Sequence, residues 1–424
     1  MASPEVITLQ VPAPYGDIGR AAIDPTLAFQ QLEIAQRLSE AEYVDAAPDF
    51  HTAPSVVAEV KELIAAGVDI KFTNPLDIHA LDPDAQLRVD TAADQLAHDP
   101  NGAAKFLSAP AMAKWGPLTK RAIALHTLYG ASTLNTLGEG ISPAVYEKPL
   151  FPKADGQVLS AADIIRAEKA ARPEKAEQII TSYTDFVQEP IDPDSRLFYQ
   201  GSMDARAVRT RALTATEEVV EHFAHAAPGT KMKSASLACG AAGPVKDLVQ
   251  AMEDQKGVEF DEVILVDKDP MALASAEALT EDIEEKVRLE HRDLLAEKLT
   301  DYIEPESVDV VDLLGLFEYI PDDERMGPWA TALLQNVQQI VKPGGTIVFG
   351  NMLNERPQQK FFTDVVKWPR LYQRTVQDVL TIIEKAGFDK NSVRVRIPAK
   401  EGVYAVYTIA IPERESKMPQ HLRM

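Results

Sequence analysis

The sequence predicts an α/β protein in two parts, a mainly helical part up to about residue 195 and a sheet-forming part after it. In the first part, apolar residues recur every three or four positions, which is the period of amphipathic helices. From about Lys231, short β-branched runs alternate with helical windows, as is typical of a mostly parallel sheet with helices on both faces. We therefore expect domains at 1–195 and 196–424.

The N-terminal part holds the clearest helical spacing in the segments 25–44, 53–67 and 116–138. It ends in "EPIDPDSRLF", residues 189–198, whose two prolines and three acids predict a linker. The strands expected after it are 234–239, 262–267, 286–293, 308–314, 346–352, 392–398 and 404–411. No internal repeat or low-complexity tract interrupts either part.

Composition narrows the class of protein. The 43 Lys and Arg residues and 65 Asp and Glu residues give a formal charge of −22, which repels polyphosphate backbones and argues against a nucleic-acid partner. A single cysteine, Cys239, excludes an intrachain disulfide framework and fits a reducing compartment. No apolar window has the length of a signal peptide core or a membrane span. We expect a cytoplasmic enzyme or binding protein without a membrane partner.

The turn "ACGAAG", residues 238–243, follows the first expected strand and contains only small residues. In a doubly wound sheet a ligand binds outside the carboxyl ends of the strands, and small residues let it approach the backbone there. Many α/β proteins have such turns without a nucleotide, and Ala238 stands where a full G-x-G-x-x-G would begin, so the turn alone is a weak signal.

Acids at the ends of the next two strands strengthen the case for a nucleotide. Asp267 ends the second strand, where a carboxylate accepts hydrogen bonds from two ribose hydroxyls. Asp293 follows the third strand, where a carboxylate can accept from an exocyclic adenine amine. Each acid could instead cap a helix, although Asp269 before Pro270 suits that role better than Asp267 does.

In order and spacing, these motifs resemble those of class I S-adenosylmethionine-dependent methyltransferases. The strand "VDVVDLL" and the "KPGG" turn at 342–345 belong to the same pattern, which covers about 198–412. Within the superfamily, "GLFEYIPDD" and "KWPRLYQRT" are similar to a subgroup of fatty-acid methyl ester biosynthesis proteins. Two residues depart from the pattern, Ala238 in place of the first glycine and Ser236 in place of an acid. An NAD-binding fold is the alternative, but it would require the complete glycine fingerprint, which this sequence does not have.

The resemblance implies a Rossmann-like, seven-stranded domain with an antiparallel last strand, an N-terminal helical lid and the cofactor S-adenosyl-L-methionine. One of Arg206, Arg209 and Arg211 could bind the methionyl carboxylate, or all three could form a solvated basic face. For the aromatic residues Tyr199 and Phe317, core packing is the alternative to contact with the cofactor. The expected cofactor-binding residues are Tyr199, Arg206, Cys239, Gly240, Ala241, Gly243, Asp267, Lys268, Met271, Asp293, Leu294, Leu314, Gly315 and Phe317.

We expect the partner to be a small-molecule acceptor, with an anionic carboxylate methylated on oxygen as the preferred class. A carboxylate ionises by itself at neutral pH, and the C-terminal part has few internal histidines to serve as a general base. The expected acceptor pocket contains Tyr319, Asn351, Trp368, Tyr372 and Arg374. No catalytic residue and no metal site are predicted. The alternatives are an N- or C-methyltransferase, an aminocarboxypropyl transferase and a cofactor-binding partner subunit, and a homodimer stays open.

Overall fold

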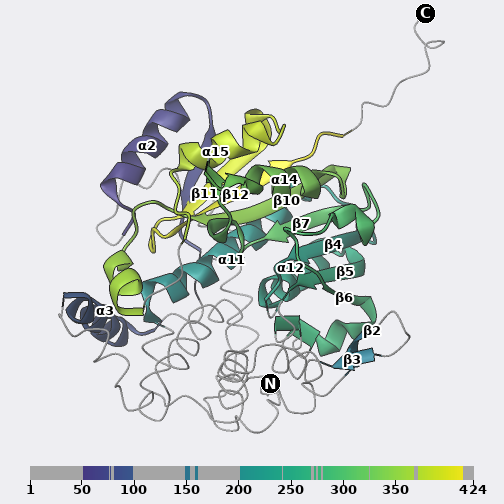
Figure 1. Cartoon of the computed structure of the whole chain (residues 1–424), viewed down its shortest axis with the longest axis horizontal. Coiled ribbons are helices and arrows are strands. Elements are labelled where there is room, and N and C mark those ends of the chain that lie inside the picture. The colour runs from purple at the N-terminus through teal and green to yellow at the C-terminus, as the bar shows by residue number, and fades with distance from the viewer. Residues whose placement is uncertain are drawn as a thin grey trace, which may run out of the picture.

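An eight-stranded sheet lies at the centre of the structure (Figure 1). The computed structural model describes residues 51–75, 77, 81–98, 149–152, 158–160, 201–240, 242–268, 272–273, 276–277, 280–323, 325–366 and 371–413. The strands follow one another across the sheet in the order β1, β11, β12, β10, β7, β4, β5 and β6. Their bounds are β1 Asp69–Thr73, β4 Lys231–Leu237, β5 Glu259–Asp267, β6 Val287–His291, β7 Val308–Leu313, β10 Val341–Met352, β11 Val393–Pro398 and β12 Tyr404–Ala410.

Seven of these strands have the arrangement that the sequence predicts. β4 pairs in parallel with both β5 and β7, and β10 pairs in parallel with β7. β12 runs antiparallel to β10 on one side and to β11 on the other, which confirms the expected direction of the last strand. β5 also pairs in parallel with β6. Because β4, β5, β6 and β7 all run in the same direction, their carboxyl ends lie at one edge of the sheet.

The eighth strand comes from the N-terminal part of the chain. β1 pairs in parallel with β11, from Asp69 opposite Arg394 to Thr73 opposite Pro398. The helix before it, α2 (Pro54–Ala65), buries its apolar side chains in the same core as α15 (Val376–Lys385). The expected boundary at residue 195 therefore does not apply to this segment, because its amphipathic helix packs on the sheet and its strand extends the sheet.

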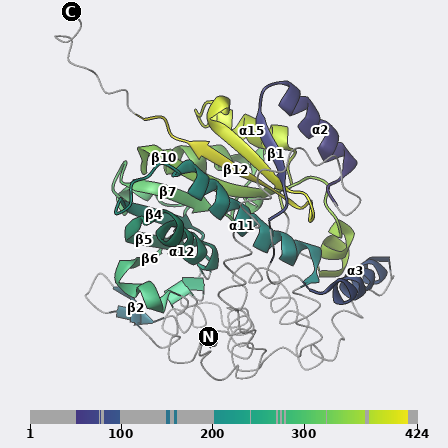
Figure 2. The same ribbon diagram turned by 180° about the vertical axis from the view of Figure 1, so that it is seen from behind.

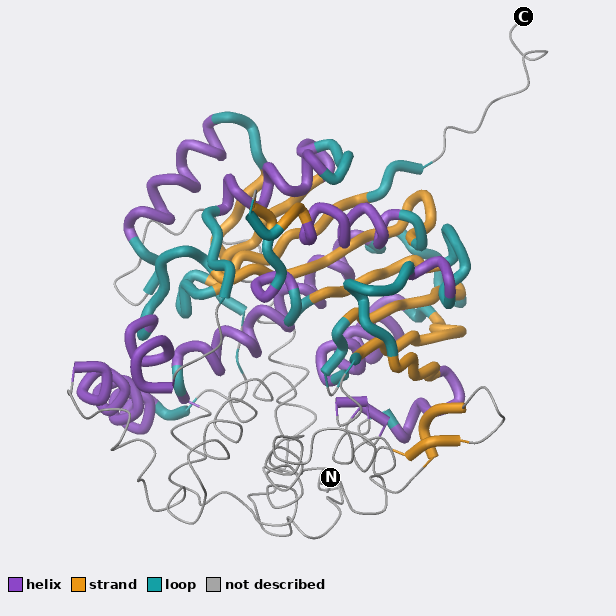
Figure 3. The backbone as a smooth tube through the Cα atoms, in the orientation of Figure 1, coloured by secondary structure: helices purple, strands orange, loops and turns teal. Residues whose placement is uncertain are grey.

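Helices cover the sheet on both faces (Figures 2 and 3). α11 (Met203–His222) and α12 (Gly243–Lys256) lie on one face, whereas α2, α14 (Trp329–Gln338) and α15 lie on the other. Successive side chains of the central strands enter opposite cores, since Val310 and Val348 pack with α11 and α12 while Val311 and Ile347 pack with α14 and α15. This double burial explains the nearly continuous apolar runs of β5, β7 and β10.

The remaining elements are short or lie outside the central sheet. They are α3 Pro83–His98, the hairpin strands β2 Pro149–Pro152 and β3 Val158–Ser160, the hairpin strands β8 Asp322–Asp323 and β9 Gly327–Pro328, the 3₁₀ turns η3 Glu281–Lys286, η4 Leu299–Asp301, η5 Phe317–Tyr319 and η7 Lys390–Ser392, and the π-helix η6 Phe361–Val366. Within the described residues, none of the helices combines the length and apolar character that crossing a membrane requires.

Candidate cofactor and acceptor site

The turn between β4 and α12 lies against the end of β5. The Cys239 amide donates to the Val266 carbonyl at 3.0 Å, and the Gly240 amide donates to Oδ2 of Asp267, also at 3.0 Å. The structure therefore brings Gly240 and Asp267 together, as the sequence predicts for two residues of one site. A Cβ atom placed on Gly240 would meet no heavy atom within 4 Å among the described residues other than its chain neighbours, so the turn is open beside this residue.

Three residues of this turn have left-handed backbone conformations. The φ angles are 57° at Ala238, 55° at Gly240 and 64° at Ala242. The left-handed region normally favours glycine, so the alanine that departs from the family pattern retains the backbone shape of the glycine it replaces. Cys239 is buried, and burial raises the pKa of its thiol well above the usual range, which makes it a packing residue and a poor nucleophile. Ala241, Met271 and Tyr199 lie outside the described residues.

The ends of β5 and β6 hold the next group of expected cofactor residues. A ring nitrogen of His291, Nε2, lies 3.0 Å from the Lys268 carbonyl oxygen and so joins the two strand ends. Oδ1 of Asp293 accepts from the Leu295 amide at 3.0 Å, which is a local turn contact and not the helix cap of the alternative, since the next helical element is η4 at Leu299–Asp301. The side chain of Leu294 is buried beside it. These residues thus share the edge that carries Gly240 and Asp267.

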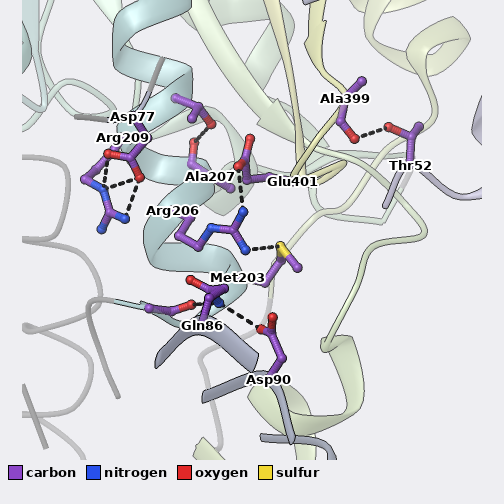
Figure 4. Close-up of polar contacts among 12 residues, drawn as sticks. Thr52, Asp77, Gln86, Asp90, Met203, Arg206, Ala207, Arg209, Ala399 and Glu401 are labelled. Carbon is purple, nitrogen blue, oxygen red and sulfur yellow. Dashed lines mark hydrogen bonds and ion pairs between the residues drawn. The ribbon is translucent and has the colours of Figure 1, made fainter. Parts of the chain in front are cut away.

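The three arginines of α11 are all buried, so they do not form a solvated basic face. Arg206 pairs with Glu401 at 3.2 Å, and Arg209 pairs with Asp77 at 2.6 Å (Figure 4). Arg211 points elsewhere, because at about 100° per residue it lies roughly 140° around the helix from Arg206. The structure therefore does not favour the expectation that Arg206 binds the cofactor, because its guanidinium already pairs with Glu401. Glu401 lies in the loop between β11 and β12.

Arg211 is the arginine that reaches the end of β7. Its guanidinium lies 3.6 Å from Glu318 and over the ring of Tyr404, with the carbon Cζ 4.5 Å from the ring centroid. A Cβ atom placed on Gly315 would lie 3.9 Å from Nη2 of Arg211, and one placed on Gly350 would lie 2.7 Å from its Cδ. The two glycines make room for this side chain between β10 and the segment after β7.

Phe317 and Leu314 lie in the same segment, but their side chains are buried. The Phe317 ring packs against Phe349, with 4.5 Å between ring centroids, and its exposed fraction is 0%. The structure therefore favours core packing for Phe317 over the expected contact with a cofactor. Gly315 keeps its place at the carboxyl edge of the sheet because it directly follows β7 and Leu314.

Two buried acids near Arg211 were missed by the sequence prediction. Asp312 lies in β7 and accepts from the Ser236 hydroxyl at 2.8 Å, while Glu318 accepts from the Tyr404 hydroxyl at 3.1 Å. Ser236 thus stands where the family pattern has an acid, and a carboxylate from the adjacent strand lies against it. The available signal was an acid inside an apolar run, as in "VDVVDLL" and "GLFEYI".

Burial changes the protonation of these acids. It raises the pKa of Asp312 to about 7, although the Ser236 hydrogen bond and the charge of Arg211 act to lower it. It also raises the pKa of Asp204 on α11 to about 6, against the effect of its ion pair with Arg356. The pKa of Glu318 is raised by the same cause and lowered in part by Arg211 and Tyr404. The site therefore contains carboxyl groups that exchange protons near neutral pH.

Several of the expected acceptor residues lie around the carboxyl end of β10. Asn351 is buried, and its Oδ1 accepts from Nη1 of Arg374 at 3.0 Å. Arg374 also donates to the carbonyls of Phe317 and Ile320, so its terminal nitrogens bind the protein itself and do not support an anionic acceptor. The Tyr372 amide donates to the Glu318 carbonyl at 2.6 Å. Tyr319 lies in η5 on the same segment, and Trp368 lies outside the described residues.

A comparison with protein families assigns most of the C-terminal part to one family. A family model described as "Putative methyltransferase" matches residues 195–414, which is just over half of the chain and nearly the range of the predicted motifs. No curated protein matches the chain.

Several solved structures are similar to the chain at low identity. A possible exported protein from Bordetella parapertussis is 19% identical, with 78% of this chain and 100% of that chain covered and a TM-score of 0.44. The CurJ carbon methyltransferase is 11% identical, with 78% and 99% covered and a TM-score of 0.40. Phosphoethanolamine N-methyltransferase 2 from Haemonchus contortus, solved with S-adenosyl-L-methionine, is 14% identical, with 47% and 53% covered and a TM-score of 0.35.

Proposed function

Because the chain belongs to the family of methyltransferases whose model matches residues 195–414, we propose that it transfers a methyl group from S-adenosylmethionine to a small molecule. The observation that carries this proposal is the hydrogen bond between the Gly240 amide and Asp267. It places an acid at the end of β5 directly beside an open, small-residue turn at the end of β4, and a ligand of an α/β sheet binds at that edge.

The residues at this edge suit the parts of the cofactor. Asp267 would accept hydrogen bonds from the ribose hydroxyls, Asp293 would lie beside the adenine, and Gly240 would allow close approach of the backbone. Bound S-adenosylmethionine supplies a methyl group that its sulfonium already activates, so the chain's own residues mainly align the acceptor and exclude water. The N-terminal part would supply the cover that this isolation requires.

The acceptor that we propose is a small carboxylic acid, methylated on oxygen. The position of the histidines supports an acceptor that needs no histidine base. Among the described residues, a ring nitrogen of His291 lies 3.0 Å from the backbone carbonyl of Lys268, and His222 contacts Gly344 at the amino-terminal end of β10, away from the proposed site. The motifs "GLFEYIPDD" and "KWPRLYQRT", which are similar to those of methyl ester biosynthesis proteins, favour the same chemistry.

The test incubates the full-length protein with methyl-labelled S-adenosylmethionine and a panel of small carboxylic acids. We expect a base-labile labelled product, formed at a rate that persists down to about pH 6 because the acceptor stays ionised there. A base-stable product whose formation falls below about pH 6.5 would instead indicate a histidine-dependent acceptor. A product heavier by an aminocarboxypropyl group would identify the other transfer, and cofactor binding without turnover would indicate a partner subunit.

A further inference from the structure

Three buried carboxyl groups are linked electrostatically near the proposed cofactor edge, because Arg211 acts on Asp312 and Glu318, and Glu318 acts on Asp204. We call Asp204, Asp312 and Glu318 the acid cluster. Their exposed fractions are 1%, 6% and 0%. They come from three different elements, α11, β7 and η5, so only the folded chain brings them together. Each of the three keeps one carboxyl oxygen that is buried and has no hydrogen-bond partner in the structure, namely Oδ2 of Asp204, Oδ2 of Asp312 and Oε2 of Glu318.

The positive charges around the acid cluster do not balance it. Arg356 pairs with Asp204, and Arg211 acts on both Glu318 and Asp312. Three carboxylates against these two guanidinium groups leave one negative charge in excess when every acid is ionised. A third cation, Arg374, also faces Glu318, but its charge is shared with Asp322 and Asp378.

The other groups that face the cluster add no positive charge. They are the Ser236 hydroxyl on β4, the Cys239 thiol after β4, the phenol of Tyr404 on β12 and the phenol of Tyr319 on η5. Within the cluster, Asp204 and Glu318 repel each other when both are ionised. An uncompensated charge in this dry surrounding is costly, so the cluster binds either a proton or another cation. The raised pKa values of Asp312 and Asp204 agree with a retained proton.

The position of the cluster points to the cation. Ser236, which donates to Asp312, lies two residues before the turn residue Ala238, and Glu318 lies in the segment that follows β7 and Gly315. These are the strand ends against which the proposed cofactor lies. S-adenosylmethionine carries a permanent positive charge on its sulfur, whereas its demethylated product S-adenosylhomocysteine is neutral at that atom.

We propose that the acid cluster is the counter-charge for the sulfonium of S-adenosylmethionine, and that it releases a proton to solvent when this cofactor binds. The inference rests on the proposed function and adds a way to distinguish the cofactor from its product. A carboxylic acid of the cluster loses its O–H proton as the sulfonium arrives, so the charge of the site stays constant. After methyl transfer the sulfur is neutral, the cluster regains a proton, and the product is held less tightly.

The test is isothermal titration calorimetry of the full-length protein with S-adenosylmethionine and with S-adenosylhomocysteine. The two ligands share the adenosine, amino and carboxyl groups and differ in the methyl group and the positive charge on sulfur. The methyl group does not ionise, so a difference in proton release reports the charge. Titrations at pH 6.5 in two buffers of different ionisation enthalpy measure the protons released. We expect S-adenosylmethionine to release about half a proton more than S-adenosylhomocysteine does, and the affinity ratio of the two ligands to rise between about pH 5.5 and pH 7.

Two variants and a matched control locate the charge. Asp312→Asn and Glu318→Gln each remove one ionisable group, and we expect them to lower the affinity ratio about tenfold and reduce the proton release while S-adenosylhomocysteine affinity stays within about twofold. Asp309→Asn is the matched control. Asp309 lies at the other end of β7, where its carboxylate accepts from the Lys233 amide and the Lys342 ammonium, so this variant should leave the affinity ratio unchanged. Far-UV circular dichroism checks that the variants fold, and the wild-type proton release needs no variant.

The outcomes distinguish a failure of the proposed function from a failure of the proposed counter-charge. Wild-type protein that binds neither ligand overturns the proposed function and the counter-charge with it. Equal proton release and an equal pH dependence for the two ligands overturn the counter-charge and leave the proposed function standing. A difference in proton release that persists unchanged in both cluster variants would also overturn it, because another group would then carry the charge.

Discussion

Asp267 connects the turn after β4 with the end of β5, because one carboxylate oxygen accepts from the Gly240 amide. The same side chain is the expected partner of the ribose hydroxyls. We therefore expect its charge to have two consequences, one for the shape of the turn and one for ligand binding. Replacing it with asparagine separates the two, since an amide oxygen can still accept from Gly240 but carries no charge.

We expect Asp267→Ala to weaken S-adenosylmethionine binding by about 1 to 3 kcal/mol, because the hydroxyls lose a charged acceptor. Asp267→Asn should have a smaller effect in the same direction. Calorimetry of both variants measures this, with Asp261→Ala as the control, since Asp261 lies in the same strand but pairs with the exposed Lys231. Unchanged affinity in Asp267→Ala would remove this residue from the site.

Asp312 makes stability depend on pH in an unusual direction. Its pKa is raised to about 7 in the folded chain, so between about pH 4 and pH 7 the folded state holds a proton that the unfolded state has lost. The contribution of this group to stability is present at low pH and is lost as the pH rises through this window. Urea unfolding of wild type and Asp312→Asn should show the variant gaining relative stability as the pH rises, and a constant difference would contradict the raised pKa.

At the scale of elements, a network of ion pairs joins α11, β11 and β1. Glu218 on α11 bonds Nε of both Arg394 and Arg396 of β11 at 2.7 Å, and Arg396 also pairs with Asp69 at the start of β1. Glu218 is buried, whereas the side chain of Asp69 is 48% exposed. The two acids thus contact one arginine from surroundings that differ in access to water.

We expect Glu218→Gln to lower the free energy of unfolding by about 3 kcal/mol, because it leaves buried guanidinium charge unpaired. Asp69→Asn is the matched variant, and its loss should be below about 1 kcal/mol because water screens the exposed pair. Urea denaturation of both variants measures the difference. Equal losses would show that the burial of Glu218 does not decide the strength of this network.

At the scale of the whole molecule, α2 and β1 of the N-terminal part share a hydrophobic core with the C-terminal part. Val56, Val60 and Ile70, from α2 and β1, are buried in the same core as α15 and β11. Removing them would leave the β11 edge unpaired and an apolar face exposed. The described structure is therefore one α/β unit whose first helix and strand precede the family-matched range by more than a hundred residues.

We expect deletion of residues 1–190 to give protein that aggregates or lacks the cooperative unfolding of the full chain. The soluble fraction after expression and the thermal unfolding profile measure this. A soluble truncated protein that binds S-adenosylmethionine with full affinity would show that residues 191–424 fold alone and that α2 and β1 are dispensable.

Local patterns in the sequence determined much of the fold and part of the site. Alternating β-branched runs and helical windows predicted seven strands of the sheet, because each strand buried on both faces must be apolar along its length. The antiparallel direction of the last strand was implied by the family resemblance, and the structure confirms it. The turn 238–243 and Asp267 were predicted as one site because the ends of neighbouring parallel strands meet at one edge, and the structure places them in contact.

Contacts between distant segments were decided only by the tertiary structure. The segment 69–73 has no local feature that selects β11 as its partner, since pairing depends on the edge that the rest of the chain leaves open. Arg206, Arg209 and Arg211 look alike in the sequence, yet the helix directs them to Glu401, Asp77 and Glu318. The acid cluster joins α11 to β7 and η5, which lie far from α11 in the chain, and burial, which raises the pKa values of its members, exists only once those elements pack.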